Sequence, residues 1–296
     1  MGCGGFIFPY LPRRALPRRC YRWSAAGYCN RIWIVSSCKT IKYPYRMMNV
    51  IKSLWVWVSS ISFVLLAFPV SALLWLISLL FDPLRRLNNR WMILQGIVVT
   101  KMSPFWKIIV EGREKIDQKQ PYIIVPNHQS MLDIVFFNML YHRLRWVSKI
   151  EVFKIPVLGW EMKMVKYIAL ERGNKHSVAK MMESCVTSLR DGISIVIFPE
   201  GTRSLTGAIG KFKTGAFQLA VKTDKPLLPV LIDGTGDILP KHGFIFKNHR
   251  TVRIRVLDPV FPGQFVTGDT EELAARIQSV MVKAMDELRS EPGYKK

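Results

Sequence analysis

The longest apolar run in the chain covers residues 54–81, LWVWVSSISFVLLAFPVSALLWLISLLF, with 28 residues and no charge. A buried core helix rarely runs so long, so the pattern predicts a helical membrane anchor. As one straight helix it would measure about 42 Å, against a hydrocarbon core of roughly 30 Å. Pro69 divides the run, so a tilted, kinked span and a shallow re-entrant hairpin are both open. Basic residues flank both ends of the run, so the positive-inside rule gives no clear orientation across the membrane. This symmetry favours the hairpin.

From about residue 91 the pattern changes to short apolar runs that alternate with amphipathic stretches. Strands are predicted at 121–127, 193–199, 226–234 and 251–259, where β-branched runs end in turn residues. Helices are predicted at about 131–142, 175–191, 214–223 and 270–289, the last with Asp269 and Glu272 as a capping pair. This alternation predicts an α/β fold with a mixed, largely parallel sheet flanked by helices, preceded by the apolar helical anchor.

Three parts are expected along the chain: a basic segment at 1–46, the membrane anchor at 47–90, and an α/β domain at 91–296. Segment 1–46 is rich in arginine and lacks acidic residues, as organellar transit peptides do, and it has no clear secretory signal. We expect it to be disordered or outside the working protein, because Met47 would be a natural start for a bacterial membrane protein.

The charge balance points to anionic partners. The chain has 43 Lys and Arg against 21 Asp and Glu, a net charge of +22, and none of the acidic residues precedes Asp82. Nucleic acid, anionic lipid and phosphorylated substrates all fit such a balance. A membrane-tethered nucleic-acid-binding module is the remote alternative, because the later basic residues are scattered and form no recognisable binding motif. The spacing of the cysteines predicts no zinc site and makes Cys185 a buried or incidental thiol.

A histidine stands where the first predicted strand gives way to a helix, in the sequence IIVPNHQSMLD. Within one helix, residues five apart point about 140° apart, so His128 and Asp133 would not meet there. If Ser130 is the N-cap and Asp133 its capping-box partner, His128 lies in the turn and can fold back onto the carboxylate. Such a pair suits a general base, since the carboxylate fixes the tautomer and raises basicity at the other nitrogen. A capping box beside an incidental histidine is the alternative.

A second polar turn, FPEGTRS, follows the strand at 193–199. Ligands bind at the ends of strands in α/β sheets. Gly201 allows close backbone approach, and Arg203 offers a fork for phosphate oxygens. Lys211 and Lys213 add cationic character at the same place.

Together, His128-x-x-x-x-Asp133 and Phe-Pro-Glu-Gly-Thr-Arg at 198–203 resemble the motifs of the glycerolipid acyltransferase family, over roughly residues 90 to 260. Within that family the chain looks like the 1-acylglycerol-3-phosphate (lysophosphatidic acid) acyltransferases. LPVLIDG at 228–234 matches the last family block. In KYIALER at 166–172, Arg172 matches the family's arginine and Glu171 replaces its aspartate, while the block's usual glycine and phenylalanine are absent.

The resemblance implies transfer of an acyl group from a thioester to the sn-2 hydroxyl of 1-acyl-glycerol-3-phosphate, giving phosphatidic acid. It implies His128 and Asp133 as catalytic residues, and Arg203 and Arg172 as phosphate ligands. Glu200, Gly201 and Thr202 belong to the same binding loop. No metal or other cofactor is expected, and the co-substrate is acyl-CoA or acyl carrier protein.

The alternatives keep the chemistry and change the acceptor to glycerol-3-phosphate, another lysophospholipid or a lyso-aminolipid. The expected partners are lysophosphatidic acid, the acyl donor and the lipid bilayer, with no nucleic acid. The expected location is a bacterial inner membrane with the active site facing the cytoplasm.

Overall fold

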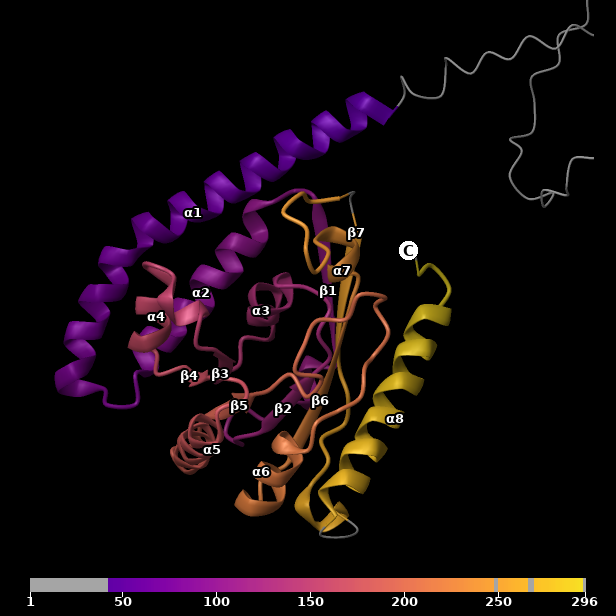
Figure 1. The fold of residues 1–296 in the computed structure, drawn as a ribbon. Helices are drawn as coiled ribbons and strands as arrows, with labels where there is room; N and C mark the ends of the chain where they lie inside the picture. The colour runs from indigo at the N-terminus through magenta and orange to yellow at the C-terminus, as the bar shows by residue number, and fades with distance from the viewer. Residues whose placement is uncertain (1–41, 248–249, 266–268, 295–296) are drawn as a thin grey trace, which may run out of the picture. The chain divides into compact units, whose positions relative to one another are not determined.

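The strands of the described residues form one seven-stranded sheet in the order β1-β7-β6-β2-β5-β3-β4 (Figure 1). The computed structural model describes residues 42–247, 250–265 and 269–294. Only β6 and β7 pair antiparallel, so the sheet is mixed and largely parallel, as predicted. The strands are β1 Trp106–Glu111, β2 Ile123–Pro126, β3 Leu144–Lys149, β4 Ile168–Leu170, β5 Ser194–Val196, β6 Leu227–Asp233 and β7 Arg250–Val256.

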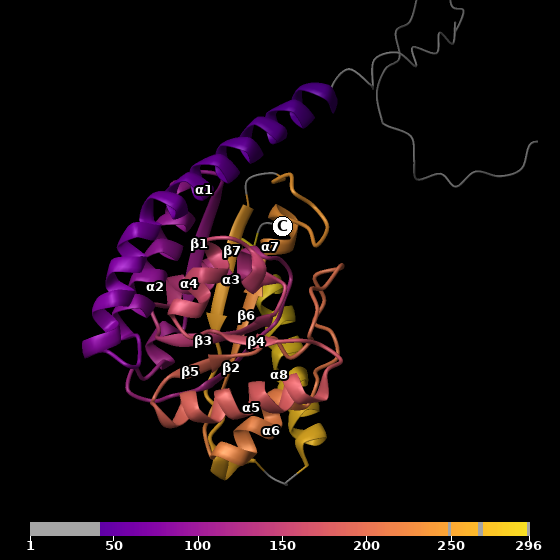
Figure 2. The ribbon, with the colours of Figure 1, turned by 60° about the vertical axis from the view of Figure 1, so that its left-hand side comes forward.

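Helices cover both faces of this sheet. The helices are α1 Lys42–Phe81, α2 Arg86–Met102, α3 Leu132–Phe136, α4 Leu158–Met164, α5 Lys175–Arg190, α6 Gly215–Thr223, α7 Thr235–Ile238 and α8 Thr270–Ser290. Short 3-10 turns occupy Arg113–Lys115, Phe137–Leu140, Val152–Lys154 and Pro262–Gln264. Figures 1 and 2 show α1 to α4 on one side of the sheet and α5, α6 and α8 on the other.

Alternation along the strands divides the interior into two cores. Ile124 of β2 faces the core that contains Phe136 and Trp146, on the side of α3. Its neighbours Ile123 and Val125 face the core formed with α5, α6 and α8. Because successive side chains of a strand point to opposite faces, a strand that is apolar throughout is buried on both.

The predicted elements are confirmed in kind. The four predicted strands correspond, in chain order, to β2, β5, β6 and β7. The four predicted helices correspond to α3 with its 3-10 extension, α5, α6 and α8. Asp269 caps α8 by accepting from the backbone N–H of Glu271 and Glu272. The sequence patterns missed α2, α4, α7, β1, β3 and β4.

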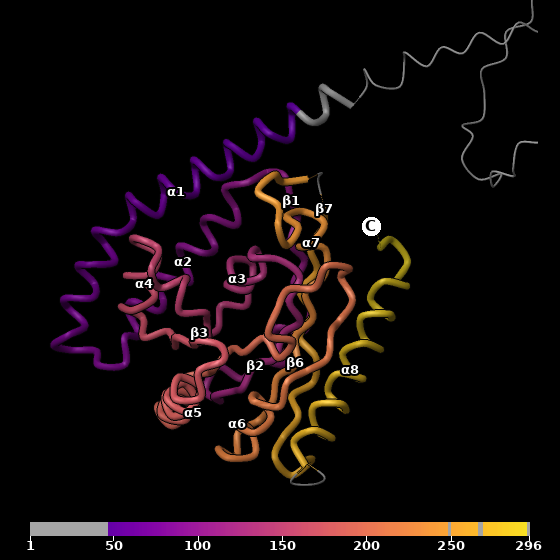
Figure 3. The backbone as a smooth tube through the Cα atoms, in the orientation of Figure 1, coloured from indigo at the N-terminus to yellow at the C-terminus, as the bar shows by residue number. Residues whose placement is uncertain are grey.

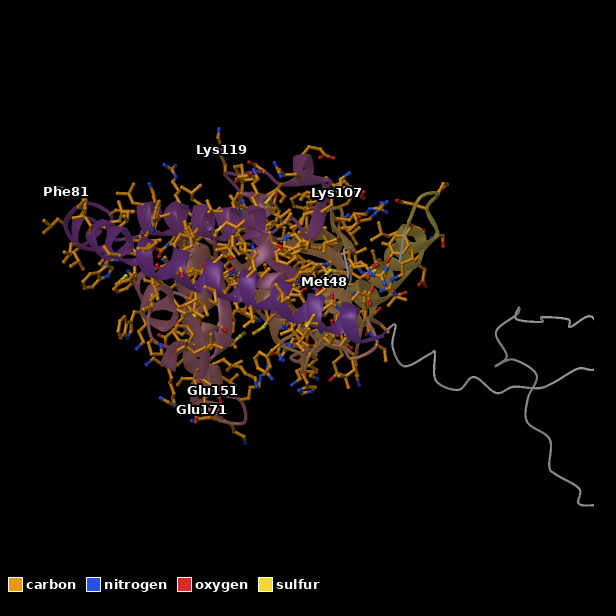
Figure 4. The ribbon with its side chains drawn as sticks, turned by 90° about the horizontal axis from the view of Figure 1, so that it is seen from above. Met48, Phe81, Lys107, Lys119, Glu151 and Glu171 are labelled. Atoms are coloured by element: carbon orange, nitrogen blue, oxygen red, sulfur yellow. The ribbon has the colours of Figure 1, made fainter. Side chains whose placement is uncertain are left out.

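Helix α1 is continuous through Pro69. The prediction of a re-entrant hairpin that turns at Pro69 is therefore wrong. The physical reason is the packing of the helix on the side that faces the α/β body. Pro69 is exposed, while Ala67 and Ser71 beside it are buried against the body, and this packing offsets the cost of a proline inside the helix. Figure 4 shows Met48 and Phe81 at opposite ends of this helix. Residues 47–81 are long and apolar enough to cross a membrane, which indicates membrane association.

Polar contacts hold α1 along the α/β body over much of its length. The indole N–H of Trp57 donates to the carbonyl of Phe244 (2.8 Å), and the hydroxyl of Ser53 accepts from the N–H of Phe246 (2.7 Å). Further along, the Ser71 hydroxyl donates to the buried carboxylate of Glu161 (2.5 Å). The chain from Tyr45 onward forms one compact unit, and α2 continues across the expected boundary between residues 90 and 91. Segment 1–41, most of the expected basic segment, lies outside the described residues.

Candidate active site

The site begins at the carboxyl end of β2, where Asn127 fixes the backbone. Its side-chain amide donates to the carbonyl of Ile232 (2.9 Å) and accepts from the N–H of the same residue (2.8 Å). The buried Asn127 side chain therefore extends the pairing of β2 with β6 by one step. This pairing sets the direction in which the next residue, His128, leaves the sheet.

His128 and Asp133 meet as the sequence predicts. The Nδ1 of His128 lies 2.8 Å from Oδ2 of Asp133. The carboxylate is fully buried, whereas the imidazole is 15% exposed. Since a carboxylate can only accept, Nδ1 carries the proton, and Nε2 presents a lone pair. Nε2 forms no hydrogen bond among the described residues, so it is open to a substrate.

The start of α3 braces this carboxylate. The backbone N–H groups of Gln129 and Ser130 both donate to Asp133 Oδ2, at 2.7 and 2.9 Å. The predicted capping box is confirmed in part: Asp133 accepts from the N–H of Ser130, but the Ser130 hydroxyl accepts from the N–H of Leu132 (3.3 Å) and not from that of Asp133. The helix begins one residue later than expected, at Leu132, and the Ser130 hydroxyl also donates to the carbonyl of Leu239. Asp133 thus supports the helix start and the imidazole together.

The imidazole rests on an aromatic stack. The rings of His128 and Phe198 lie 3.8 Å apart and are tilted by only 14°. Phe198 in turn stacks on Trp146, with ring centres 5.4 Å apart. Trp146 pairs with Val196, and Phe198 follows two residues later on the same face. The two strands β3 and β5 therefore hold the plane of the His128 ring.

Glu200 ties the loop after β5 to the turn after β2. Its Oε1 accepts from the backbone N–H of His128 (2.8 Å), and its Oε2 accepts from the N–H of Gly210 (3.0 Å). Burial raises the pKa of this carboxyl, and the two backbone donors oppose the rise. One buried carboxylate thus fixes both ends of the loop beside His128.

The other predicted loop residues lie next to Glu200 in the chain. Gly201 has φ +66°, and a side chain here would meet Lys213 Cε at 3.1 Å, so the position favours glycine. Thr202 accepts from the ammonium group of Lys241 (3.0 Å). Arg203 precedes Ser204, whose N–H donates to the carbonyl of His128 (2.8 Å). Arg203 forms no hydrogen bond or ion pair with any described residue, so its guanidinium is free to bind an anion.

Arg172 lies further from the dyad than the other predicted residues. It is exposed in the turn after β4, the edge strand of the sheet, and Figure 4 shows neighbouring Glu171 at the margin of the molecule. It shares the carboxyl edge with His128, but β5 and β3 stand between their strands. With strands about 4.8 Å apart, β2 and β4 are separated by roughly 14 Å. Only a long side chain and a large ligand could connect the two positions.

Thr235 is the principal residue that sequence reasoning missed. Its hydroxyl donates to Oδ1 of Asp133 (2.5 Å), and the side chain is fully buried. Gly234, with φ +94°, makes the turn after β6, and a side chain there would meet the Thr251 carbonyl at 2.7 Å. The signal in the sequence was the position of Thr235 directly after the block LPVLIDG. Asp133 therefore has donors on both carboxylate oxygens.

A pocket of about 430 Å³ has Gln129, the residue after His128, in its wall. It lies between the loop after β5 and the loop that joins α7 to β7, and Lys241, Arg250 and Arg289 are among its lining residues. Gln129 reaches Asp233 (3.0 Å), which is also bound by Arg289 (2.7 Å). These donors hold the pKa of Asp233 below its usual value, although burial acts in the opposite direction. Figure 3 shows the loop after β5 running beside the end of α8 that carries Arg289.

Comparison with known proteins places this site in a family. The family model described as Acyltransferase matches residues 107–233. A chloroplastic 1-acyl-sn-glycerol-3-phosphate acyltransferase of Arabidopsis thaliana is 37% identical over 62% of this chain and 51% of its own length. A Mycoplasma genitalium protein named "Probable 1-acyl-sn-glycerol-3-phosphate acyltransferase" is 31% identical over 69% of this chain and 76% of its own length. The chain spans about half the length of the chloroplast relatives it matches.

A solved structure has the same architecture. The crystal structure of the 1-acyl-sn-glycerophosphate acyltransferase of Thermotoga maritima has a TM-score of 0.70 and 26% identity, and the match covers 84% of this chain and 99% of the other. The chain belongs to the acyltransferase family that includes the 1-acyl-sn-glycerol-3-phosphate acyltransferases, which confirms the resemblance drawn from its two motifs.

Proposed function

We propose that the protein transfers a fatty acyl group from an acyl thioester to the sn-2 hydroxyl of 1-acyl-glycerol-3-phosphate, giving phosphatidic acid in phospholipid biosynthesis. The observation that carries this proposal is the braced His128–Asp133 pair, whose open Nε2 lies beside an anion-binding loop. The printed names of the relatives point to the same reaction.

The geometry suits direct attack by the acceptor alcohol. As the hydroxyl oxygen attacks the thioester carbonyl carbon, His128 Nε2 takes the hydroxyl proton. Asp133 on Nδ1 stabilises the imidazolium that forms. The carbon–sulfur bond then breaks, and the proton passes to the departing thiolate. The products are an ester and a free thiol, and no residue of the chain is acylated.

Arg203 and Gly201 form the phosphate-binding part of the proposed site. Arg203 offers a planar fork for phosphate oxygens, and Gly201 lets the loop backbone come close to them. Thr202 and Glu200 shape the same loop through Lys241 and His128. Arg172 would contact the outer part of the acceptor, in keeping with its distance from the dyad. The donor is acyl-CoA or acyl carrier protein, used as a co-substrate without another cofactor.

Membrane attachment would use the exposed face of α1. Its body-facing side includes Ser53, Val56, Ala67, Ser71 and Ser78, and its other side exposes large apolar residues. A helix bound to the α/β body along this length cannot cross the bilayer alone, so we infer that it lies in the membrane surface. We place the site on the cytoplasmic face of a bacterial inner membrane. Fractionation and protease protection of tagged protein test this, and recovery in an organellar membrane would contradict it.

One acyl-transfer assay tests the acceptor. Membranes that contain the protein receive labelled acyl-CoA together with lysophosphatidic acid, glycerol-3-phosphate or lysophosphatidylcholine in parallel. We expect label in phosphatidic acid and little in the other products. Transfer to glycerol-3-phosphate alone or to lysophosphatidylcholine alone would overturn the proposed acceptor. Membranes with the His128→Ala protein supply the background.

A further inference from the structure

The loop that joins α7 to β7, residues 239–247, carries apolar side chains that the proposed chemistry does not use. Phe244 is 75% exposed and Ile245 is 42% exposed, although their neighbour Phe246 is buried. The ring of Phe246 packs against Trp57 and Trp106, at 5.4 and 5.7 Å between ring centres. The loop is thus anchored through one aromatic residue and presents the two residues before it to the outside.

The same loop is bound to the apolar helix α1. The Trp57 indole donates to the Phe244 carbonyl, and the Phe246 N–H donates to the Ser53 hydroxyl. Leu54 and Ile61 lie three residues before and four residues after Trp57, on the same face of the helix, and are 58% and 56% exposed. Figures 1 and 2 both show the loop beside the N-terminal half of α1. Phe244 and Ile245 therefore continue the exposed apolar surface of the helix.

Cationic residues accompany this apolar surface. Lys241 and Lys247 lie on either side of Phe244 in the loop, and Arg250 begins β7. Aromatic and aliphatic side chains flanked by lysine and arginine are typical of segments that rest in a lipid interface, where the cations meet phosphate groups. Contiguous exposed apolar surface of this kind, rimmed by polar residues, marks interaction sites for proteins or membranes.

We propose that residues 239–247 form a second membrane-binding element, the α7–β7 loop, which inserts Phe244 and Ile245 into the lipid surface beside α1. Pro240, Lys241, His242 and Gly243 of this loop also line the pocket next to Gln129. Insertion therefore places the mouth of that pocket at the lipid–water boundary. Its catalytic consequence rests on the proposed function: an acceptor lipid would reach His128 from the membrane without first dissolving in water.

Photocrosslinking tests the insertion without relying on activity. The full-length protein carries p-benzoylphenylalanine in place of Phe244 and is bound to vesicles of phosphatidylethanolamine and phosphatidylglycerol. The matched control carries it in place of Val221, which is 41% exposed on α6, across the sheet from α1. We expect lipid adducts at position 244 and not at 221. Adducts at neither position, or equally at both, would overturn the proposal.

A kinetic comparison tests the consequence for the substrate. Phe244→Asp is assayed with long-chain lysophosphatidic acid in vesicles and with a short-chain analogue dissolved as monomers. We expect the vesicle concentration at half-maximal rate to rise about tenfold, which corresponds to about 1.4 kcal/mol, with little change for the soluble analogue. Ile245→Asp is assayed in the same way. If both variants lose the same fraction of their rate on the vesicle substrate and on the soluble analogue, insertion is contradicted. A wild-type protein that is inactive on both would instead contradict the proposed function and leave the crosslinking result standing.

Discussion

Two histidines at opposite edges of the sheet show how the surroundings of a side chain decide its role. His128 follows β2 at the carboxyl edge of the sheet, with Asp133 on Nδ1 and an open Nε2. His142 precedes β3 at the amino edge, where Nδ1 lies 3.0 Å from Gln118 Oε1 and Nε2 lies 2.7 Å from the Ser194 hydroxyl. Both rings have a hydrogen-bonded Nδ1, but only His128 keeps a nitrogen for a substrate.

The two rings also differ in solvation. His142 is 4% exposed, and burial together with the neighbouring Arg143 lowers its pKa to about 4. The comparison teaches that a buried, fully bonded imidazole is a neutral packing element. A half-buried imidazole at a strand end, with one nitrogen braced and one free, is suited to proton transfer.

The largest expected effect comes from His128→Ala. We expect the rate of acyl transfer to fall by about 10²- to 10⁴-fold, because the proton acceptor is lost. The midpoint of thermal unfolding should change little, since the imidazole makes one side-chain hydrogen bond at a partly exposed position. His142→Ala is the matched control and should show the reverse, lower stability with normal turnover per folded molecule. The comparison fails if both variants lose activity to the same extent.

Acid should reveal His142 through stability. Its folded pKa of about 4 lies below the unfolded value of 6.5, so the unfolded state binds more protons between these pH values. The contribution of neutral His142 to the free energy of unfolding is fully present above pH 6.5. It falls as the pH is lowered and levels off below about pH 4. The loss is roughly 3 kcal/mol. Chemical unfolding in detergent across this range measures it, and a His142→Gln protein that keeps the same slope would refute the assignment.

Part of this account could be predicted from the sequence alone. The dyad was predictable because His128 and Asp133 are close in the chain and lie at a recognisable strand-to-helix junction. The strands β2, β5 and β6 were predictable because apolar runs dominate them, and β7 because its apolar residues alternate with polar ones. The fold class follows from the same alternation.

The rest depends on contacts between distant residues or on mixed patterns. Thr235 is 102 residues from Asp133, and no local pattern connects them. The exposed Lys107 in β1 and the buried Arg145 in β3 break the apolar runs that identify strands. Helix α2 buries Asn88, Asn89 and Gln95, polar residues whose partners lie on other elements.

Two arginines offer the next comparison. We expect Arg203→Ala to raise the KM for lysophosphatidic acid by roughly 10- to 100-fold, the range for loss of a hydrogen bond to a charged group worth about 1.5–3 kcal/mol. Arg172→Ala should raise it no more than about fivefold, because an exposed ion pair contributes about 1 kcal/mol or less. Steady-state kinetics on mixed micelles measures both. Equal effects would show that the turn after β4 reaches the phosphate as closely as the loop after β5.

A separate effect, on kcat alone, is expected at Thr235, which we interpret as a positioning residue. Thr235→Val keeps the shape and removes the donor to Asp133 Oδ1, so we expect kcat to fall about tenfold with KM unchanged. Thr235→Ser should restore most of the rate because the hydroxyl is retained. If valine and serine variants behave alike, the hydrogen bond has no part in catalysis.

The central claim is direct attack by a lipid hydroxyl whose proton His128 accepts. The most direct test follows thiol release from acyl-CoA by purified protein, with and without lysophosphatidic acid, alongside mass spectrometry of the protein. The account predicts thiol release only when the acceptor is present, one phosphatidic acid per thiol, and no acylated residue. Release of one thiol per protein molecule without acceptor, together with an acyl-protein adduct, would contradict it.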